Sequence, residues 1–184
     1  MNNKQFAEIS KFLSYVLRHE PQAIGLTLDR EGWADIDALI SAAAQHGRRL
    51  NRELLDLVVC TSEKMRFAVS EDGASIRAVQ GHSTDSVSIS FEDNPPPPLL
   101  YHGTATRFLE SIRAQGLLPG ARQHVHLTEN VQTAMSVGQR YGKPVVLTIA
   151  AGTMHNKGIK FYQAQNGVWL IPTVPVQFLS ESSG

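Results

Sequence analysis

The chain has 184 residues, and its 17 lysines and arginines are matched by 17 aspartates and glutamates. A neutral chain of this length can bury one large core or two small ones, but it has no overall field that would attract nucleic acid or a membrane surface. Cys60 is the single cysteine, which excludes an intrachain disulfide and a cysteine-based zinc site, and its apolar neighbours lead us to expect a buried core thiol.

The neutral total hides a difference between the two halves of the chain. Residues 1–93 carry 10 basic and 14 acidic side chains, a net charge of −4, whereas residues 94–184 carry 7 and 3, a net charge of +4. The second half is therefore the better place for a multiply charged anion such as a dinucleotide. No signal peptide opens the chain and no apolar run approaches the length of a membrane span, so we expect a cytoplasmic protein.

Apolar residues with helical spacing predict a first helix that ends near Glu20. They are Phe6, Ile9, Phe12, Leu13, Val16 and Leu17. Pro21 disfavours helical geometry at the residue before it. Arg18 and His19 therefore fall in the last turn, where a cation complements the helix dipole.

Two more helices and a β-ribbon follow. Asp35 and Asn51 are predicted to cap the helices, and segments 65–69 and 75–79 alternate like strands around a turn. Three helices and a β-ribbon suggest a winged-helix module, a shape typical of nucleic-acid-binding proteins. Because this half is acidic overall, its affinity for RNA would have to come from a local basic patch. The candidates are Arg48, Arg49 and Arg52.

Four consecutive prolines, residues 95–98, separate the two halves. Such a run favours a stiff polyproline conformation and suits a spacer better than a core element. Residues 87–91 before it alternate like an edge or linking strand. We therefore predict a first domain at residues 1–93, a linker at 94–98 and a second domain at 99–184.

The second half opens with a short apolar strand that leads directly into His102, Gly103 and Thr104. Gly103 has no Cβ and would let a ligand approach the backbone closely. Thr106 is placed to cap a helix that ends at Gly116. The turn from His102 to Thr104 is thus a candidate ligand-binding segment.

Arg122 and an alternating strand come next. In the alternating run, His124 and His126 share one face, and Val125 and Leu127 share the other. A His-Gly-Thr turn, an arginine-bearing loop and a histidine-bearing strand together predict the wall of a site for a polar, anionic ligand.

The remaining elements complete an α+β fold. We expect a helix capped within residues 128–130 and running to Gly138, a buried strand at 144–150, a hairpin at the turn 166–167 and a last strand at 174–179. No Gly-x-Gly-x-x-Gly motif follows a strand, so a dinucleotide would not be held as in a Rossmann fold.

Several short motifs, taken in order, extend over nearly the whole chain. They are Leu17-Arg18-His19, Gly32-Trp33, Lys64-Met65-Arg66-Phe67, Gly81-His82-Ser83, Tyr101-His102-Gly103-Thr104, Arg122-x-x-Val125-His126-Leu127 and Gly167-Val168-Trp169-Leu170. In their order and spacing they resemble the RNA 2′-phosphotransferases.

The resemblance implies a winged-helix RNA-binding domain joined to an ADP-ribosyltransferase-like domain that binds NAD and consumes it as co-substrate. The family removes an internal 2′-phosphate from RNA, as left by some routes of tRNA splicing, and releases 2′-hydroxyl RNA, nicotinamide and ADP-ribose 1″,2″-cyclic phosphate. Its catalytic set falls here on Arg18, His19, Arg66 and Arg122. The expected partner is a tRNA-like RNA, with no obligate protein partner and no membrane.

The same resemblance assigns NAD binding to a second set of residues. They are His102, Gly103, Thr104, His126, Leu127, Thr128, Gly138 and Val168. Many protein ADP-ribosyltransferases use a glutamate where this family has a hydrophobic residue, here Val168. No metal is expected, because His124 and His126 have neither a cysteine cluster nor a His-x-x-x-His motif beside them.

Two other classes of function stay open. An ADP-ribosyltransferase that modifies protein, or terminal nucleic-acid phosphates, would use the same NAD-binding domain with a different acceptor. A non-catalytic winged-helix regulator that senses NAD would not need all four catalytic residues. The product formed from NAD distinguishes these alternatives.

Overall fold

The first helix of the computed structural model, which describes residues 3–62 and 64–181, is α1 (Asn3–Arg18). Leu13, Val16 and Leu17 are completely buried on one face of it. The helix ends before Pro21, as predicted, because proline restricts the residue that precedes it. Arg18 is therefore the last helical residue, and His19 follows directly.

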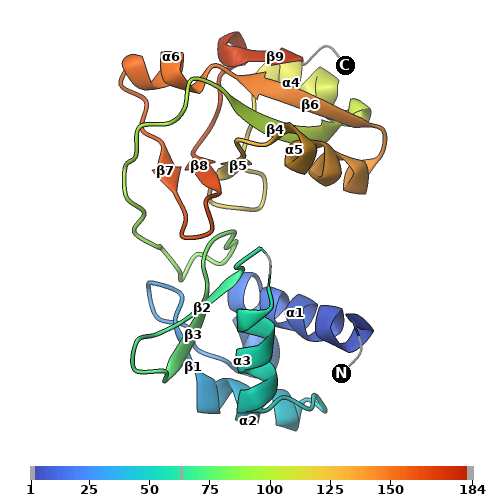
Figure 1. The fold of residues 1–184 in the computed structure, drawn as a ribbon, viewed down its shortest axis with the longest axis vertical. Coiled ribbons are helices and arrows are strands. Elements are labelled where there is room, and N and C mark those ends of the chain that lie inside the picture. Colours follow the sequence, from blue (N-terminus) through green and yellow to red (C-terminus); the bar gives the residue numbers. More distant parts are fainter. Residues whose placement is uncertain (1–2, 63, 182–184) are drawn as a thin grey trace. The chain divides into compact units, whose positions relative to one another are not determined.

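The rest of the first half combines helices with a small antiparallel sheet. Its elements are η1 (Pro21–Ile24), β1 (Ala34–Asp35), α2 (Ile36–Gln45), α3 (Arg52–Cys60), β2 (Phe67–Val69) and β3 (Ser75–Ala78) (Figure 1). The strand order is β1-β3-β2. Both predicted caps are confirmed: the Asp35 carboxylate accepts from the Ala38 N–H, and the Asn51 side chain accepts from the Leu54 N–H.

Two expectations for the first half are wrong. Cys60 is exposed, because α3 buries Leu55 and Val58 and its last residue points away from that face. Residues 87–91 form no strand, although Val87 and Ile89 are buried as the alternation suggests. Alternating burial needs only an extended chain on a core, whereas a strand also needs a paired backbone.

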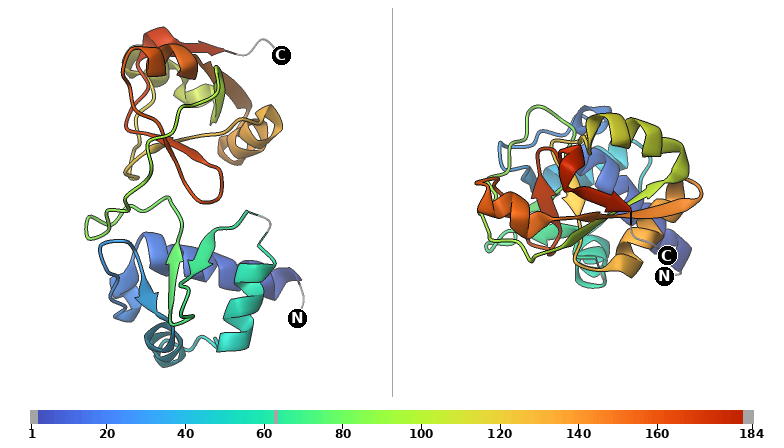
Figure 2. Two further views of the ribbon diagram at one scale, coloured as in Figure 1. Left: turned by 60° about the vertical axis from the view of Figure 1, so that its left-hand side comes forward. Right: turned by 90° about the horizontal axis from the view of Figure 1, so that it is seen from above.

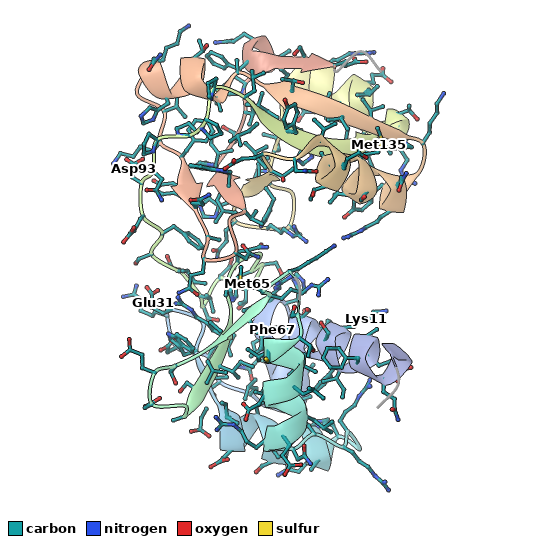
Figure 3. All side chains as sticks on the ribbon, in the orientation of Figure 1. Lys11, Glu31, Met65, Phe67, Asp93 and Met135 are labelled. Carbon is teal, nitrogen blue, oxygen red and sulfur yellow. The ribbon has the colours of Figure 1, made fainter. Side chains whose placement is uncertain are left out.

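The chain divides into two compact units, Met1–Ser90 and Phe91–Gly184. The proline segment is held along the second unit. Asp93, labelled in Figure 3, lies 3.3 Å from the Lys160 ammonium group, and the Pro98 carbonyl accepts a hydrogen bond from the Gly152 N–H.

The second unit contains two antiparallel sheets. Its elements are β4 (Leu100–Ala105), η2 (Thr106–Phe108), α4 (Leu109–Gln115), β5 (Val125–Leu127), α5 (Val131–Gly138), η3 (Gln139–Tyr141), β6 (Pro144–Ile149), α6 (Ala151–Asn156), β7 (Tyr162–Gln163), β8 (Trp169–Ile171), η4 (Val176–Phe178) and β9 (Leu179–Glu181). The strand orders are β4-β6-β9 and β5-β8-β7. Small sheets with interspersed helices make the fold α+β, as predicted.

Two residues link the sheets. Tyr101 and Thr128 exchange backbone hydrogen bonds of 2.8 and 2.9 Å, which joins the start of β4 to the residue after β5. The predicted hairpin is confirmed as β7 and β8, which pair across the turn at Gly167. The buried strand at 144–150 is confirmed as β6, the centre of its sheet.

Three local expectations for the second unit need correction. Thr106 does not cap a helix but begins η2, so α4 starts only at Leu109. The last strand is β9 rather than residues 174–179, because Pro175 is followed by the short helix η4. Helix α6 was not predicted, since its six residues are too few for a clear period. Within residues 3–62 and 64–181, no helix combines the length and apolar character needed to cross a membrane.

Candidate functional site

The C-terminal end of α1 carries two of the predicted catalytic residues, Arg18 and His19. The last four carbonyl groups of a helix lack partners within it. Here the Ser83 N–H donates to the Arg18 carbonyl at 2.9 Å, and His82 forms a hydrogen bond with the backbone of Leu17. A loop far along the chain, residues 81–83, therefore supplies hydrogen-bond partners to the C-terminal end of this helix.

The same loop contacts both side chains. His19 Nδ1 lies 2.9 Å from Ser83 Oγ. The side chain of Arg18 lies beside Gly81, where a Cβ would be in ordinary van der Waals contact with its Cδ and Nε atoms, at 3.8 Å. The loop thus defines where Arg18 and His19 stand.

His82 lies in the middle of this loop and is only 3 % exposed. Burial, reinforced by the nearby charges of Arg18, His19 and Arg77, lowers the pKa of its imidazole to about 4. A neutral ring at this position avoids adding another cation to a cluster of cations.

Arg66, the third predicted catalytic residue of the first unit, is half-buried directly before β2. Its carbonyl accepts from the Val79 N–H at 3.0 Å, two residues before Gly81. The preceding residue, Met65, is 57 % exposed and has a φ of +38°, a strained value for a side chain of this kind (Figure 3). Arg66 therefore directly precedes β2, whose partner strand β3 leads toward the loop of residues 81–83.

In the second unit, His102 on β4 is bound to β5. Its Nδ1 lies 3.0 Å from the carbonyl of His126. A carbonyl only accepts, so Nδ1 carries the proton of the neutral ring and Nε2 is left as an acceptor. Burial lowers the pKa of His102, an effect that this hydrogen bond partly offsets and the charge of Arg122 reinforces.

Arg122 is exposed in the loop before β5, and its Nη1 lies 3.4 Å from His126 Nδ1. His126 is half-buried, whereas its neighbours Val125 and Leu127 are buried. The predicted alternation is confirmed for these three residues. Arg122, His126 and His102 therefore form one contiguous group.

Strand β4 packs against helix α5 (Figures 1 and 2), and Gly103 and Gly138 lie at this contact. A Cβ at Gly103 would lie 1.7 Å from the Ala134 carbonyl oxygen, and one at Gly138 would lie 2.4 Å from the Thr104 oxygen. The packing of α5 thus explains why residue 103 has no Cβ. The earlier interpretation of Gly103 as an opening for a ligand is not needed, and its assignment to an NAD site stays a prediction.

Three more predicted NAD-binding residues lie at one end of the ladder between β5 and β8, and they are Leu127, Thr128 and Val168. Leu127 has a buried side chain and pairs with Trp169 of β8. This register places Thr128 and Val168, both half-buried, at the same end of the ladder. Thr104 is buried in β4.

His124 lies outside this group. Its ring stands edge-on to those of Phe91 and Tyr162, with centroids 5.8 and 6.1 Å away, and burial lowers its pKa. Among the residues that the structure describes, no three His, Cys, Asp or Glu side chains are grouped to hold a metal.

Two side-chain contacts were not foreseen. Ser83 was recognised only as part of a motif, and nothing in the sequence paired it with His19. Glu129 accepts a hydrogen bond from the Trp169 indole at 2.8 Å, and nothing in the sequence paired these two residues either. Both pairs are far apart in the chain, so no local pattern could have found them.

Comparison with known proteins shows which family the chain belongs to. Residues 4–173 match the model of a family described as RNA 2′-phosphotransferase, Tpt1 / KptA family. A protein of Pseudomonas fluorescens strain Pf-5, named probable RNA 2′-phosphotransferase, is 60 % identical over 97 % of this chain and 98 % of its own length. A protein of the same name from Escherichia coli O45:K1 strain S88 is 60 % identical over 97 % of this chain and 92 % of its own. The chain therefore belongs to the RNA 2′-phosphotransferase family.

Proposed function

We propose that this protein removes an internal 2′-phosphate from RNA and consumes NAD in doing so. The products would be 2′-hydroxyl RNA, nicotinamide and ADP-ribose 1″,2″-cyclic phosphate. The observation that carries the proposal is membership of the family over residues 4–173, with Arg18, His19, Arg66 and Arg122 all present. The expected RNA is a tRNA-like molecule.

In this proposal the two units have different tasks. The first unit, with three α-helices and the hairpin of β2 and β3, would be a winged-helix module that binds RNA. The second unit would be an ADP-ribosyltransferase-like domain that binds NAD. Its excess of basic side chains supports that assignment, since NAD is anionic.

The residues of the second unit suit a dinucleotide. His102 offers Nε2 as an acceptor, which fits a ribose hydroxyl, and the exposed Arg122 offers a guanidinium group to a phosphate. The pyridinium of NAD would supply a good leaving group at the anomeric carbon of the ribose.

In the first step the arginines would orient the 2′-phosphate for attack on that carbon. A phosphate monoester carries about −1.5 to −2 charges at pH 7. One guanidinium group can bind two of its oxygens at once through two parallel N–H donors. The phosphate would also supply the negative charge that a developing cation needs. This explains why a carboxylate is unnecessary at Val168, and why Glu129 can be engaged by Trp169 instead.

In the second step the ribose 2″-hydroxyl would attack the phosphodiester, and the RNA 2′-oxygen would leave. This step needs stabilisation of a crowded phosphorane and a proton for a poor leaving group. Arg18 and Arg122 are suited to the first task. His19, which can hold a proton on its ring, is suited to the second.

The test is to mix the protein with NAD and an oligonucleotide that carries one internal 2′-phosphate, and to identify the products by mass spectrometry. ADP-ribose 1″,2″-cyclic phosphate with 2′-hydroxyl RNA would support the proposal. Nicotinamide release with a stable ADP-ribosylated nucleic acid or protein would indicate an ADP-ribosyltransferase. Binding of NAD without any turnover would indicate a regulator.

A further inference from the structure

The loop of residues 81–83 holds the end of α1 through its backbone and its side chains. Ser83 donates its N–H to the Arg18 carbonyl at 2.9 Å, and its Oγ lies 2.9 Å from His19 Nδ1. Ser83 therefore binds two consecutive residues of the predicted catalytic set at once. The contact between Oγ and Nδ1 limits the rotation of the His19 ring.

The loop itself is rigidly placed. His82 is 3 % exposed and bonded to the Leu17 backbone. A Cβ at Gly32 would lie 3.1 Å from His82 Nε2, so the ring is packed tightly from that side as well. The Ser83 hydroxyl on this loop therefore has a defined position, and the contact with it orients the His19 imidazole.

A hydroxyl is also the right chemical group for this position. It accepts a hydrogen bond from Nδ1 when the imidazole is protonated, and it donates to Nδ1 when that nitrogen is bare. With a hydrogen on Nδ1, that nitrogen donates to Ser83 Oγ whether or not Nε2 carries a proton, so the contact is kept when Nε2 gains or loses one.

We propose that Ser83 is a positioning residue, which orients the His19 imidazole so that Nε2 is presented to the phosphate in both of its protonation states. This inference rests on the proposed function and adds to it a residue that acts through His19 alone.

The first test compares Ser83→Ala, Ser83→Val and Ser83→Thr in the complete protein. With NAD and a short 2′-phosphorylated oligonucleotide, Ala and Val should lower kcat about 10-fold with KM nearly unchanged, because one orienting hydrogen bond is lost. Thr keeps the hydroxyl and should restore kcat to within about 3-fold. Ser86→Ala is the matched control, since Ser86 is exposed in the adjoining segment and bonds to Thr84.

The second test asks whether Ser83 acts through His19. Adding Ser83→Ala to His19→Ala should cause no further loss, because the ring to be oriented is already absent. A further loss of about 10-fold in the double variant would show that Ser83 acts independently and would overturn the inference. Full activity of a folded Ser83→Ala variant would overturn it too.

A third measurement needs no turnover. The ring nitrogens of His19 can be observed by ¹⁵N NMR and assigned with the His19→Ala variant. Ser83→Ala should move the Nδ1 resonance, and Ser86→Ala should not; an unmoved resonance contradicts the inference. If the wild type does not act on NAD and RNA, the proposed function fails, and the NMR result still decides whether Ser83 holds His19.

Discussion

At the scale of single residues, the predicted catalytic arginines differ in how the protein holds them. Arg18 lies near Gly81, and Arg66 is half-buried directly before β2, whereas Arg122 is exposed near His126. Guanidinium groups bind phosphate oxygens bidentately and stay charged at any physiological pH. All three are therefore suited to a phosphate ligand.

Arg122→Ala should lower turnover about 10- to 150-fold, the equivalent of about 1.5–3 kcal/mol for a charge-assisted hydrogen bond to phosphate. Its exposed position means that stability should not change. Arg107→Ala, another exposed arginine of the second unit, is the control. Single-turnover rates measure the effect, and a near-normal rate in a folded Arg122→Ala protein would count against the assignment.

Arg18→Ala and His19→Ala should slow the second chemical step more than the first. The first step expels nicotinamide, a good leaving group, whereas the second expels an alkoxide from a crowded phosphorane. Both variants should therefore accumulate RNA joined to ADP-ribose through its 2′-phosphate, seen as a slower band on a gel.

The wild type should show little of this adduct. If neither variant accumulates it, and both release nicotinamide as slowly as they form product, then the two residues serve the first step or binding.

At the scale of elements, contacts between the end of α1 and a loop stabilise the first unit. The close packing of β4 with α5 stabilises the second. The loop of residues 81–83 supplies hydrogen bonds to the C-terminal end of α1. The Ser83 N–H donates to the Arg18 carbonyl, and the buried, neutral His82 bonds to the Leu17 backbone. Strand β4 and helix α5 approach through Gly103 and Gly138, where no side chain fits.

Acid should destabilise the first unit through His82. Its pKa is about 4 in the folded protein and 6.5 ordinarily, so between these values the unfolded chain takes up a proton that the folded chain does not. The contribution of His82 to the free energy of unfolding is therefore fully present above pH 6.5. It is lost as the pH drops toward 4, and at pH 5 the loss is about 2 kcal/mol.

His82→Gln should flatten this dependence, with the exposed His46→Gln as control. Urea unfolding followed by the fluorescence of Trp33, in a Trp169→Phe background, reports on the first unit alone. An equally steep pH dependence in His82→Gln would assign the effect to other groups.

Gly103→Ala should destabilise the second unit by about 3 kcal/mol, the upper part of the range for overpacking, because the added Cβ meets the backbone of α5. Gly158→Asn is the control, since a Cβ there meets no atom within 4 Å and asparagine tolerates its positive φ. Denaturant unfolding followed by Trp169 fluorescence measures both. An unchanged midpoint for Gly103→Ala would mean that α5 can move away from β4 at little cost.

At the scale of the whole molecule, charge and chemistry are divided between the halves. The first half carries a net charge of −4 and the second a net charge of +4. In the proposed reaction NAD would supply the leaving group, nicotinamide, and the roles of the protein groups would be electrostatic and acid–base. The complete reaction should thus depend on NAD and on the predicted catalytic side chains of the protein.

Activity should require NAD and should survive EDTA. Nicotinamide release and 2′-phosphate removal are measured with and without the chelator, with NAD omitted as the negative control. Loss of both activities in EDTA, restored by zinc, would contradict this and would direct attention to His124 and His126 as ligands.

By itself the sequence determined the helices and strands with clear periods and caps. The first helix, the capped helices α2, α3 and α5, the β2–β3 ribbon and the β7–β8 hairpin all follow from local signals, because caps and turns are interactions between near neighbours. The motifs also identified the family, which the match over residues 4–173 confirms. Local signals failed at Thr106, Cys60 and residues 174–179.

Only the tertiary structure decided which distant residues meet. It pairs His19 with Ser83 and His102 with the His126 carbonyl, and it fills the empty side of Gly103 with α5. It also leaves Cys60 exposed, although its neighbours are apolar. The reason is physical: a hydrogen bond across 64 residues, or the face on which a helix is covered, depends on how elements pack. That packing has no counterpart in the spacing of residues along the chain.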